Sequence, residues 1–485
     1  TVNGAASLAG AYTCDITGLG GTDCDLISAS GAVSATAALV INLPGTAPTG
    51  FDQGSCYTWT IASGSSASAA NMSIGTKWTS TGTFAVEASG NTIVVTHKPP
   101  VPSAPTANAA TSVTTSGFQA NWSAASGATG YRLDVATDSG FTSMVSGYNN
   151  LDVGNVVLKA VSGLSAGTTY YYRLRVYNCA GTSGNSGTIT VKTICAAPTG
   201  VSATDGTLTT GVTVTWNAAT GATSYQVVRN TSDSTSGATD LGTQSSGFDD
   251  TTADPGVLYY DFVRAYNGSA YGAYSTSDSG YRKLAAPTGV AATDGTLATG
   301  VTVTWNAVTG ADSYTVYRNT TDSTTGGTDL GTQSSGFNDT TAVPGTLYYY
   351  FVRAVDSAPS HTSDYSSSNT GYRQLSPPAN VAASDGSSTA QVTVTWDAAT
   401  GATSYKVFRS AAETETHTGQ TDLGTQTSPF NDTGAAPGQK YWYWVKAVDS
   451  SPAHESDYSS ANDGYRKLAT VTITDASDNL GDKVT

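Results

Sequence analysis

The sequence predicts an all-β protein, arranged as a linear array of small β-sandwiches after a distinct N-terminal β domain. A 19-residue stretch, VTVTWNAATGATSYQVVRN from Val212, returns three more times along the chain. Within it Val212, Val214 and Trp216 alternate with threonines, which is the period-two pattern of a half-buried strand. The tryptophans of the four copies lie about 90 residues apart, which is close to the size of one sandwich.

A tyrosine follows each of these tryptophans after nine residues, with a glycine-containing turn between them. Because the spacing is equal in all four copies, we expect one β-hairpin built four times. The pairs are Trp122/Tyr131, Trp216/Tyr225, Trp305/Tyr314 and Trp396/Tyr405.

The repeat divides the chain into six parts. We expect an N-terminal β domain of unknown type, four repeats and a short C-terminal segment. The junctions are short and rich in proline, which predicts a stiff rod rather than units on flexible linkers. The expected boundaries are 1–100, 101–195 (repeat 1), 196–285 (repeat 2), 286–376 (repeat 3), 377–468 (repeat 4) and 469–485.

Composition favours a secreted protein and argues against several partners. Charged residues make up only 12% of the chain, and the net charge is −15. That charge repels phosphate backbones, so we expect no nucleic-acid partner. No apolar run approaches 18 residues, so we expect no membrane span. The chain begins at Thr1 without a methionine, and we expect a processed, mature N-terminus.

The repeats resemble fibronectin type III domains, as found in tandem in secreted bacterial surface proteins. The resemblance covers residues 101–468 and rests on the Trp strand, a Pro-Gly or Ala-Gly turn, and a Tyr-led strand as in LYYDFVRAY and LYYYFVRAV. It implies seven-stranded sandwiches in which strands A, B and E face C, F and G. It also implies tyrosine corners at Tyr170, Tyr259, Tyr348 and Tyr441. The Arg-Gly-Asp of some animal members is absent, so integrin binding is not implied.

Five cysteines are present, and structural disulfides are weighed against free buried thiols. The candidate disulfide cysteines are Cys14, Cys24, Cys56 and Cys179. In the implied topology Cys179 and Cys195 lie at opposite ends of repeat 1, too far apart for a bond. We therefore expect no 179–195 disulfide, and we expect Cys179 to face the N-terminal domain, where one of its three cysteines is available.

No motif supports catalysis, a metal site or a cofactor, and we expect none of them. His361 and His454 precede Ser-Asp-Tyr-Ser in two repeats, and a duplicated surface loop explains them better than His-Asp-Ser catalysis. A Phe-Asx-Asp step, for example Phe248 to Asp250, recurs in repeats 2 to 4. We expect its Phe in the core and its Asp capping the next turn, rather than binding calcium.

The outward face of sheet C-F-G is apolar in repeats 2 to 4. An apolar face needs a cover, and two covers are open: Arg and Lys stems of the same repeat, or another subunit or a sugar. The candidate contact residues are Tyr260, Phe262, Tyr317, Tyr349, Phe351, Phe408, Trp442 and Trp444.

The C-terminal segment LATVTITDASDNLGDKVT begins like a further repeat but lacks its proline. It is either the start of missing repeats or a strand, with Val471 and Ile473 on one face, donated to the next molecule.

Three functions fit these features. The first is an extracellular structural or adhesive protein, a subunit of a bacterial surface fibre that assembles as a homopolymer. The alternative is a carbohydrate-binding accessory region of a secreted polysaccharide-degrading enzyme, with glycans as partners. The third is a hydrolase with its active site in the N-terminal domain. Since no catalytic motif is present, we expect a protein that is not an enzyme.

Overall fold

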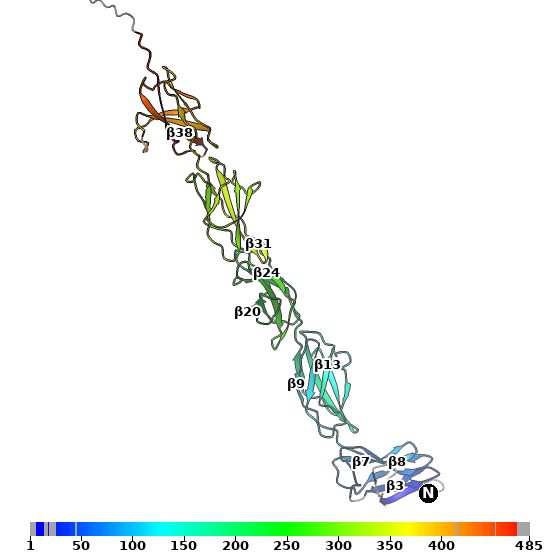
Figure 1. The fold of residues 1–485 in the computed structure, drawn as a ribbon. Helices are drawn as coiled ribbons and strands as arrows, with labels where there is room; N and C mark the ends of the chain where they lie inside the picture. Colours follow the sequence, from blue (N-terminus) through cyan, green and yellow to red (C-terminus); the bar gives the residue numbers. More distant parts are fainter. Residues whose placement is uncertain are drawn as a thin grey trace, which may run out of the picture.

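The computed structural model describes residues 6–13, 18, 26–43, 46–413, 416–451 and 453–472. All of its regular elements are β-strands. The strands form five units that follow one another in a single extended row, with the N-terminus at one end and repeat 4 at the other (Figure 1). No helix in the described ranges has the length and hydropathy to cross a membrane.

The N-terminal unit packs two sheets around one core. Trp59 and Trp78 are buried in this core, with 6.1 Å between their ring centroids. One sheet consists of β1 (Ala6–Thr13), β3 (Val33–Asn42), β5 (Ala67–Ser68) and, also on β3, β6 (Met72–Ile74). The other consists of β2 (Ile27–Ser28), β4 (Tyr57–Ser63), β8 (Thr92–Lys98) and β7 (Thr83–Ser89).

Repeat 1 is a sandwich of a three-stranded and a five-stranded sheet. The smaller sheet consists of β13 (Leu158–Ser162), β10 (Gly117–Trp122) and β9 (Ala107–Thr111). The larger consists of β12 (Leu151–Gly154), β11 (Gly130–Ala136), β14 (Thr169–Asn178), β15 (Gly181–Thr182) and, also on β14, β16 (Ile189–Lys192).

Repeat 2 has the same two sheets. The smaller consists of β17 (Thr199–Ala203), β18 (Val212–Asn217) and β21 (Phe248–Asp250). The larger consists of β20 (Thr239–Gln244), β19 (Ser224–Asn230), β22 (Leu258–Tyr266), β23 (Tyr271–Tyr274) and, also on β22, β24 (Asp278–Tyr281).

Repeats 3 and 4 repeat this order. The smaller sheet of repeat 3 consists of β25 (Ala291–Ala292), β26 (Val301–Thr304) and β29 (Phe337–Asp339). The smaller sheet of repeat 4 consists of β33 (Ala382–Ala383), β34 (Val392–Thr395) and β37 (Phe430–Asp432). The larger sheet of repeat 3 consists of β28 (Thr328–Gln333), β27 (Ser313–Asn319), β30 (Tyr348–Ser357), β31 (Ser360–Thr362) and, also on β30, β32 (Asn369–Gly371). The larger sheet of repeat 4 consists of β36 (Thr421–Gln426), β35 (Ser404–Ser410), β38 (Lys440–Ser450), β39 (Ala453–Glu455) and, also on β38, β40 (Asn462–Tyr465).

The expected Trp–Tyr hairpin is wrong. In repeat 2 the Trp strand β18 pairs with β17 and β21, whereas the Tyr strand β19 pairs with β20 and β22. The glycine turn therefore carries the chain from one sheet to the other. Trp216 and Tyr225 meet across the core, with ring centroids 5.5 Å apart. Alternating apolar residues face the core in either arrangement, so the pattern alone could not separate an arch from a hairpin.

Each larger sheet also contains a strand that the implied A-B-E/C-F-G arrangement omits, namely β12, β20, β28 and β36.

The final strand is split in two in every repeat. The two halves, for example β31 and β32 in repeat 3, pair with the same long strand. In repeat 3 the split is bridged by serine side chains: Ala354 N donates to Ser363 Oγ and Val352 N to Ser366 Oγ, at 2.9 and 3.0 Å. The serines of the Ser-Asp-Tyr-Ser motif thus continue the ladder of hydrogen bonds.

Recurrent side-chain contacts fix each sandwich. Ser165 N donates to the Tyr170 hydroxyl at 2.9 Å, which is a tyrosine corner, and the Tyr259 hydroxyl donates to Asp254 at 3.3 Å. Phe248 packs against the core of repeat 2, and Asp250 accepts from Thr252 N at 3.0 Å. The expected roles of the Phe-Asx-Asp step are therefore confirmed in this repeat.

Candidate functional site

In repeats 3 and 4, several of the candidate aromatic contact residues lie under a cover supplied by their own repeat. Phe262, Phe351 and Trp444 are buried within the described chain, so they do not lie on an open face as expected. The other five candidates, Tyr260, Tyr317, Tyr349, Phe408 and Trp442, are half-buried.

The cover is a tyrosine of the last-strand region with a cation over it. Tyr365 packs edge-on against Tyr317, with 5.1 Å between ring centroids, and Arg353 lies over Tyr365 at 5.2 Å. In repeat 4, Tyr458 packs against Phe408 at 5.1 Å, and Lys446 lies over Tyr458 at 4.3 Å. Cation–π attraction of this kind keeps the Arg353 and Lys446 side chains over the tyrosine rings. The arrangement favours the intramolecular cover over a second subunit or a sugar.

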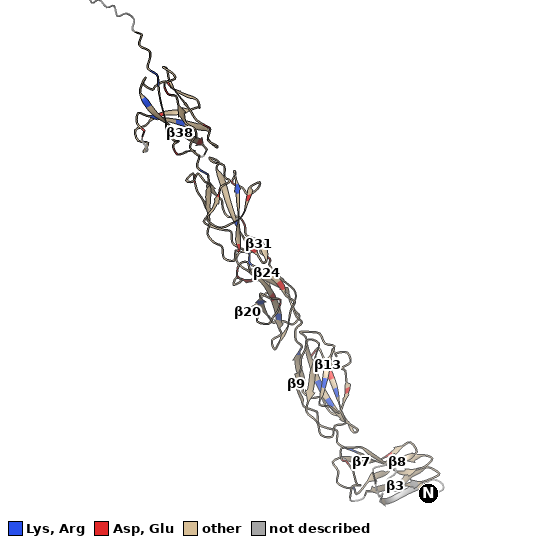
Figure 2. Cartoon of the chain, in the orientation of Figure 1, with Lys and Arg blue, Asp and Glu red and all other residues tan. Residues whose placement is uncertain are grey.

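Basic and acidic residues are scattered thinly along the array (Figure 2). No group of three or more His, Cys, Asp or Glu side chains in the described ranges is arranged to hold a metal ion.

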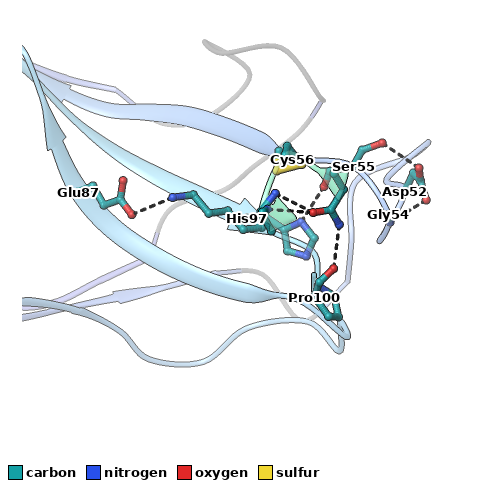
Figure 3. Close-up of a disulfide and its surroundings, with 12 residues drawn as sticks. Asp52, Gly54, Ser55, Cys56, Glu87, His97 and Pro100 are labelled. Carbon is teal, nitrogen blue, oxygen red and sulfur yellow. Dashed lines mark hydrogen bonds and ion pairs between the residues drawn. A yellow bond between two sulfur atoms is a disulfide. The ribbon is translucent and has the colours of Figure 1, made fainter. Parts of the chain in front are cut away.

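A disulfide joins the N-terminal unit to repeat 1. Cys56 and Cys179 are bonded, with 6.2 Å between their Cα atoms (Figure 3). Cys195 is a buried free thiol. Both expectations from the topology are therefore confirmed: Cys179 and Cys195 are not bonded to each other, and Cys179 bonds to a cysteine of the N-terminal unit. Burial raises the pKa of the Cys195 thiol. Cys14 and Cys24 lie outside the described residues.

His97 lies next to this disulfide and holds the end of the N-terminal unit together (Figure 3). Its ring nitrogens contact Ser80 Oγ at 2.7 Å and the Ser55 carbonyl oxygen at 3.0 Å. Burial lowers the pKa of this histidine. The ring packs against Phe51 and Phe84, at 4.9 and 4.8 Å between centroids. We interpret His97 as a satisfied core residue, because both ring nitrogens have partners and aromatic rings enclose it.

The features that sequence reasoning missed are the side-chain and backbone contacts at the three junctions between sandwiches. At each junction one residue of the outgoing segment, here called the junction residue, is fully buried. These residues are Cys195, Leu284 and Leu375, each 0% exposed. A chain segment that buries its side chain completely between two units cannot move independently of them.

Two glycines also meet at each junction. A cap glycine in the turn before the long strand of one repeat lies against a turn glycine after the Trp strand of the next. A Cβ on Gly310 would collide with the Pro255 carbonyl beside the cap glycine Gly256. Both have left-handed φ, +85° and +81°, which glycine adopts without strain. The corresponding pairs are Gly167/Gly221 and Gly345/Gly401.

At each junction, the hairpin formed by the long strand and the next strand of the following repeat also contacts the preceding repeat. In repeat 2 this hairpin is β22–β23. Asn267 donates to the Thr193 carbonyl across the first junction at 3.0 Å, and Lys192 donates to the Gly221 carbonyl at 2.8 Å. At the second junction the ring of His361 packs on Tyr281 at 4.5 Å between centroids.

The third junction matches the second, with His454 on Tyr372 at 4.6 Å. The two histidines therefore belong to inter-repeat contacts rather than to a free surface loop. The internal repetition of His, of LAAPTG-like junctions and of the two glycines was the available signal.

The described part of the C-terminal segment has no partner strand. Val471 is exposed, and residues 467–472 form no strand. Ile473 lies outside the described residues. The donated strand therefore stays a prediction.

Strand order, tyrosine corner and end-to-end junctions make the chain an array of fibronectin type III-like β-sandwiches behind a separate β unit. No family model matches the chain. Exoglucanase B of Cellulomonas fimi is 31% identical over 301 residues, which is 55% of this chain and 25% of that protein. Poly(3-hydroxybutyrate) depolymerase of Ralstonia pickettii is 43% identical over 72 residues, which is 15% of this chain and 13% of that protein. The chain thus spans a quarter or less of the length of these curated relatives.

Solved structures are similar to parts of the chain. The FN1–FN3 domains of chicken CNTN1 are 16% identical, with 57% of this chain and 100% of that chain covered and a TM-score of 0.21. An Fn3-like protein from Clostridium thermocellum is 33% identical, with 20% and 98% covered and a TM-score of 0.17.

Proposed function

We propose that this chain is a non-catalytic accessory region of a secreted polysaccharide-degrading enzyme, in which the four sandwiches form a stiff spacer. The observation that carries the proposal is the repeated junction, where a buried junction residue and a pair of touching glycines fix each repeat against the next. The similarity to Exoglucanase B over 301 residues supports this function over a filament subunit, which was the first expectation from the sequence.

A spacer needs stiffness more than it needs a ligand-binding face. The eight candidate aromatics are buried or half-buried, so they offer few exposed rings on which sugars could stack. Linkers without structure behave as flexible coils, whereas each of these junctions holds a fully buried residue. The bacterial, extracellular location belongs to the same proposal. Self-association into a homopolymer stays a prediction, which analytical ultracentrifugation of the full chain tests.

The function is tested by joining the chain between a glucanase catalytic domain and a cellulose-binding domain. The native array is compared with an array that carries Gly310→Val and Gly401→Val, which open two junctions. We expect the double variant to act more slowly on insoluble cellulose and at the same rate on a soluble oligosaccharide. An unchanged ratio of the two rates would contradict the spacer function.

A further inference from the structure

We propose that the outer end of repeat 4 is a docking surface for a further sandwich of the same class as repeats 3 and 4. The surface consists of Gly438, Tyr465 and Leu468. This inference rests on the internal junctions and holds independently of the proposed function.

Leu468 is the residue of repeat 4 that corresponds to the three junction residues. Those three are 0% exposed, whereas Leu468 is 65% exposed. Tyr465 corresponds to Tyr281 and Tyr372, whose rings pack against His361 and His454. Tyr465 is 41% exposed. The same positions that bury apolar surface at two junctions therefore leave it open at this end.

The cap glycine of repeat 4 has the geometry of an unfilled junction. Gly438 has a φ of +79°, close to the +81° and +80° of Gly256 and Gly345. At those two positions an added Cβ would meet an Asp carboxylate and a glycine carbonyl of the next repeat. At Gly438 the three nearest atoms all belong to the Leu468 side chain. A junction residue also lies near the cap glycine in a formed junction, since a Cβ on Gly345 would come within 3.1 Å of Leu375 Cδ2. What Gly438 lacks within the described chain is therefore the contact with the Asp and the glycine of a following repeat.

The internal junctions also define the chemistry of the partner. It must present a turn glycine, as Gly310 and Gly401 do, and a hairpin with an aspartate followed five residues later by a histidine. Asp356/His361 and Asp449/His454 are the two examples in this chain. Docking would remove the exposed apolar surface of Leu468 and Tyr465 from water, which favours association, and tethering raises the effective concentration of the partner.

A second copy of this chain does not fit as the partner. The turn glycines and hairpins of repeats 2 to 4 are engaged in their own junctions. Repeat 1 has no such hairpin: Asn178 donates to the Pro100 carbonyl at 2.8 Å, and Cys179 is bonded to Cys56. The occupant that we propose is therefore a further sandwich of the repeat 3 and 4 class, docked on Leu468 as repeat 4 is docked on Leu375.

Thiol labelling at Leu468→Cys tests the proposal in three chains: the full chain, a chain that ends at residue 468, and an extended chain. In the extended chain, residues 376–468 are repeated after residue 468 in place of residues 469–485. Peptide mapping assigns the labelled cysteine. We expect fast labelling in the first two chains and at least tenfold slower labelling in the third. Leu375→Cys is the matched control and should be protected in all three.

Two further variants make the result specific. Valine in place of the appended glycine that corresponds to Gly401 should restore fast labelling. A second extended chain, with residues 285–376 appended instead, guards against an appended copy that does not fold. The proposal is wrong if neither extension protects position 468. It is also wrong if position 468 is protected in the full chain and released in the chain that ends at 468, because residues 469–485 would then be the occupant.

Discussion

Tyr350 donates a hydrogen bond to Asp339 inside the core of repeat 3, with 3.0 Å between the hydroxyl and carboxylate oxygens. Tyr443 and Asp432 form the same bond in repeat 4, at 2.9 Å. In repeat 2 the tyrosine position is Asp261, which is buried, and its Oδ1 lacks a hydrogen-bond partner within the described chain. A second carboxyl group therefore occupies the site where its sister repeats have a phenol.

This substitution makes the stability of repeat 2 depend on pH. Burial, together with the nearby Asp250 carboxylate, raises the pKa of Asp261 from 3.8 to about 7. Between these pH values the folded repeat binds a proton that the unfolded chain does not. Stability therefore falls as the pH rises from about 4 to about 7 and then stays low. The full loss is on the order of a few kcal/mol.

We expect Asp261→Tyr to raise the thermal midpoint of repeat 2 at pH 8 and to remove most of its difference between pH 5 and pH 8. Differential scanning calorimetry of the full chain at the two pH values measures both. The reciprocal change Tyr350→Asp should introduce the dependence in repeat 3. A midpoint for repeat 2 that rises with pH would refute this interpretation.

A buried ion pair lies in each of repeats 2 to 4. Arg318 contacts Asp339 at 2.5 Å, and both side chains are about nine-tenths buried or more. Arg318→Met leaves a buried charge without its partner, so we expect a loss of about 3–5 kcal/mol in repeat 3. Urea unfolding followed by hydrogen exchange in repeat 3 measures it. The control is Arg132→Met, which breaks the exposed pair with Asp152 and should cost below about 1 kcal/mol.

The aromatic face should matter for stability rather than for binding. Trp444 is buried against His417, with 5.6 Å between ring centroids. We expect Trp444→Ala to destabilise repeat 4 by about 3–5 kcal/mol and to leave retention on insoluble cellulose unchanged. Trp442→Ala, at a half-buried position under Lys440, should cost clearly less. Loss of retention in either folded variant would restore the sugar-binding hypothesis.

The disulfide should act on the two units that it joins, the N-terminal unit and repeat 1. Cys56 and Cys179 are 123 residues apart in the sequence, and closing so long a loop restricts the unfolded chain, which stabilises the folded chain by about 4–5 kcal/mol. We expect Cys56→Ser to lower the melting temperature of the N-terminal unit and of repeat 1 and to leave repeats 2 to 4 unchanged. Cys195→Ala should not alter the response to a reductant, and a reductant effect that depends on Cys195 would contradict the pairing.

Periodicity predicted the sandwiches because Val212, Val214 and Trp216 report directly which side of a strand is buried. It could not predict which sheet the next strand joins, since Tyr225 faces the core in either case. It also missed the cover over Phe408, because Tyr458 lies 50 residues further along the chain, in the segment between β39 and β40, and reaches Phe408 only in the folded repeat. The junctions were visible as short linkers, but the roles of Gly310 and His361 depend on the orientation of two whole units.

The most direct test of the stiff spacer is small-angle X-ray scattering of the full chain against Gly310→Ala. The added methyl group meets the Pro255 carbonyl, whereas the control Gly326→Ala has a similar φ of +75° and open space around it. We predict that the native chain and Gly326→Ala give the same maximum dimension and cross-section of an extended rod, and that Gly310→Ala gives a shorter, broader distribution. A native chain that already scatters as a flexible, bent ensemble, indistinguishable from Gly310→Ala, would contradict the account.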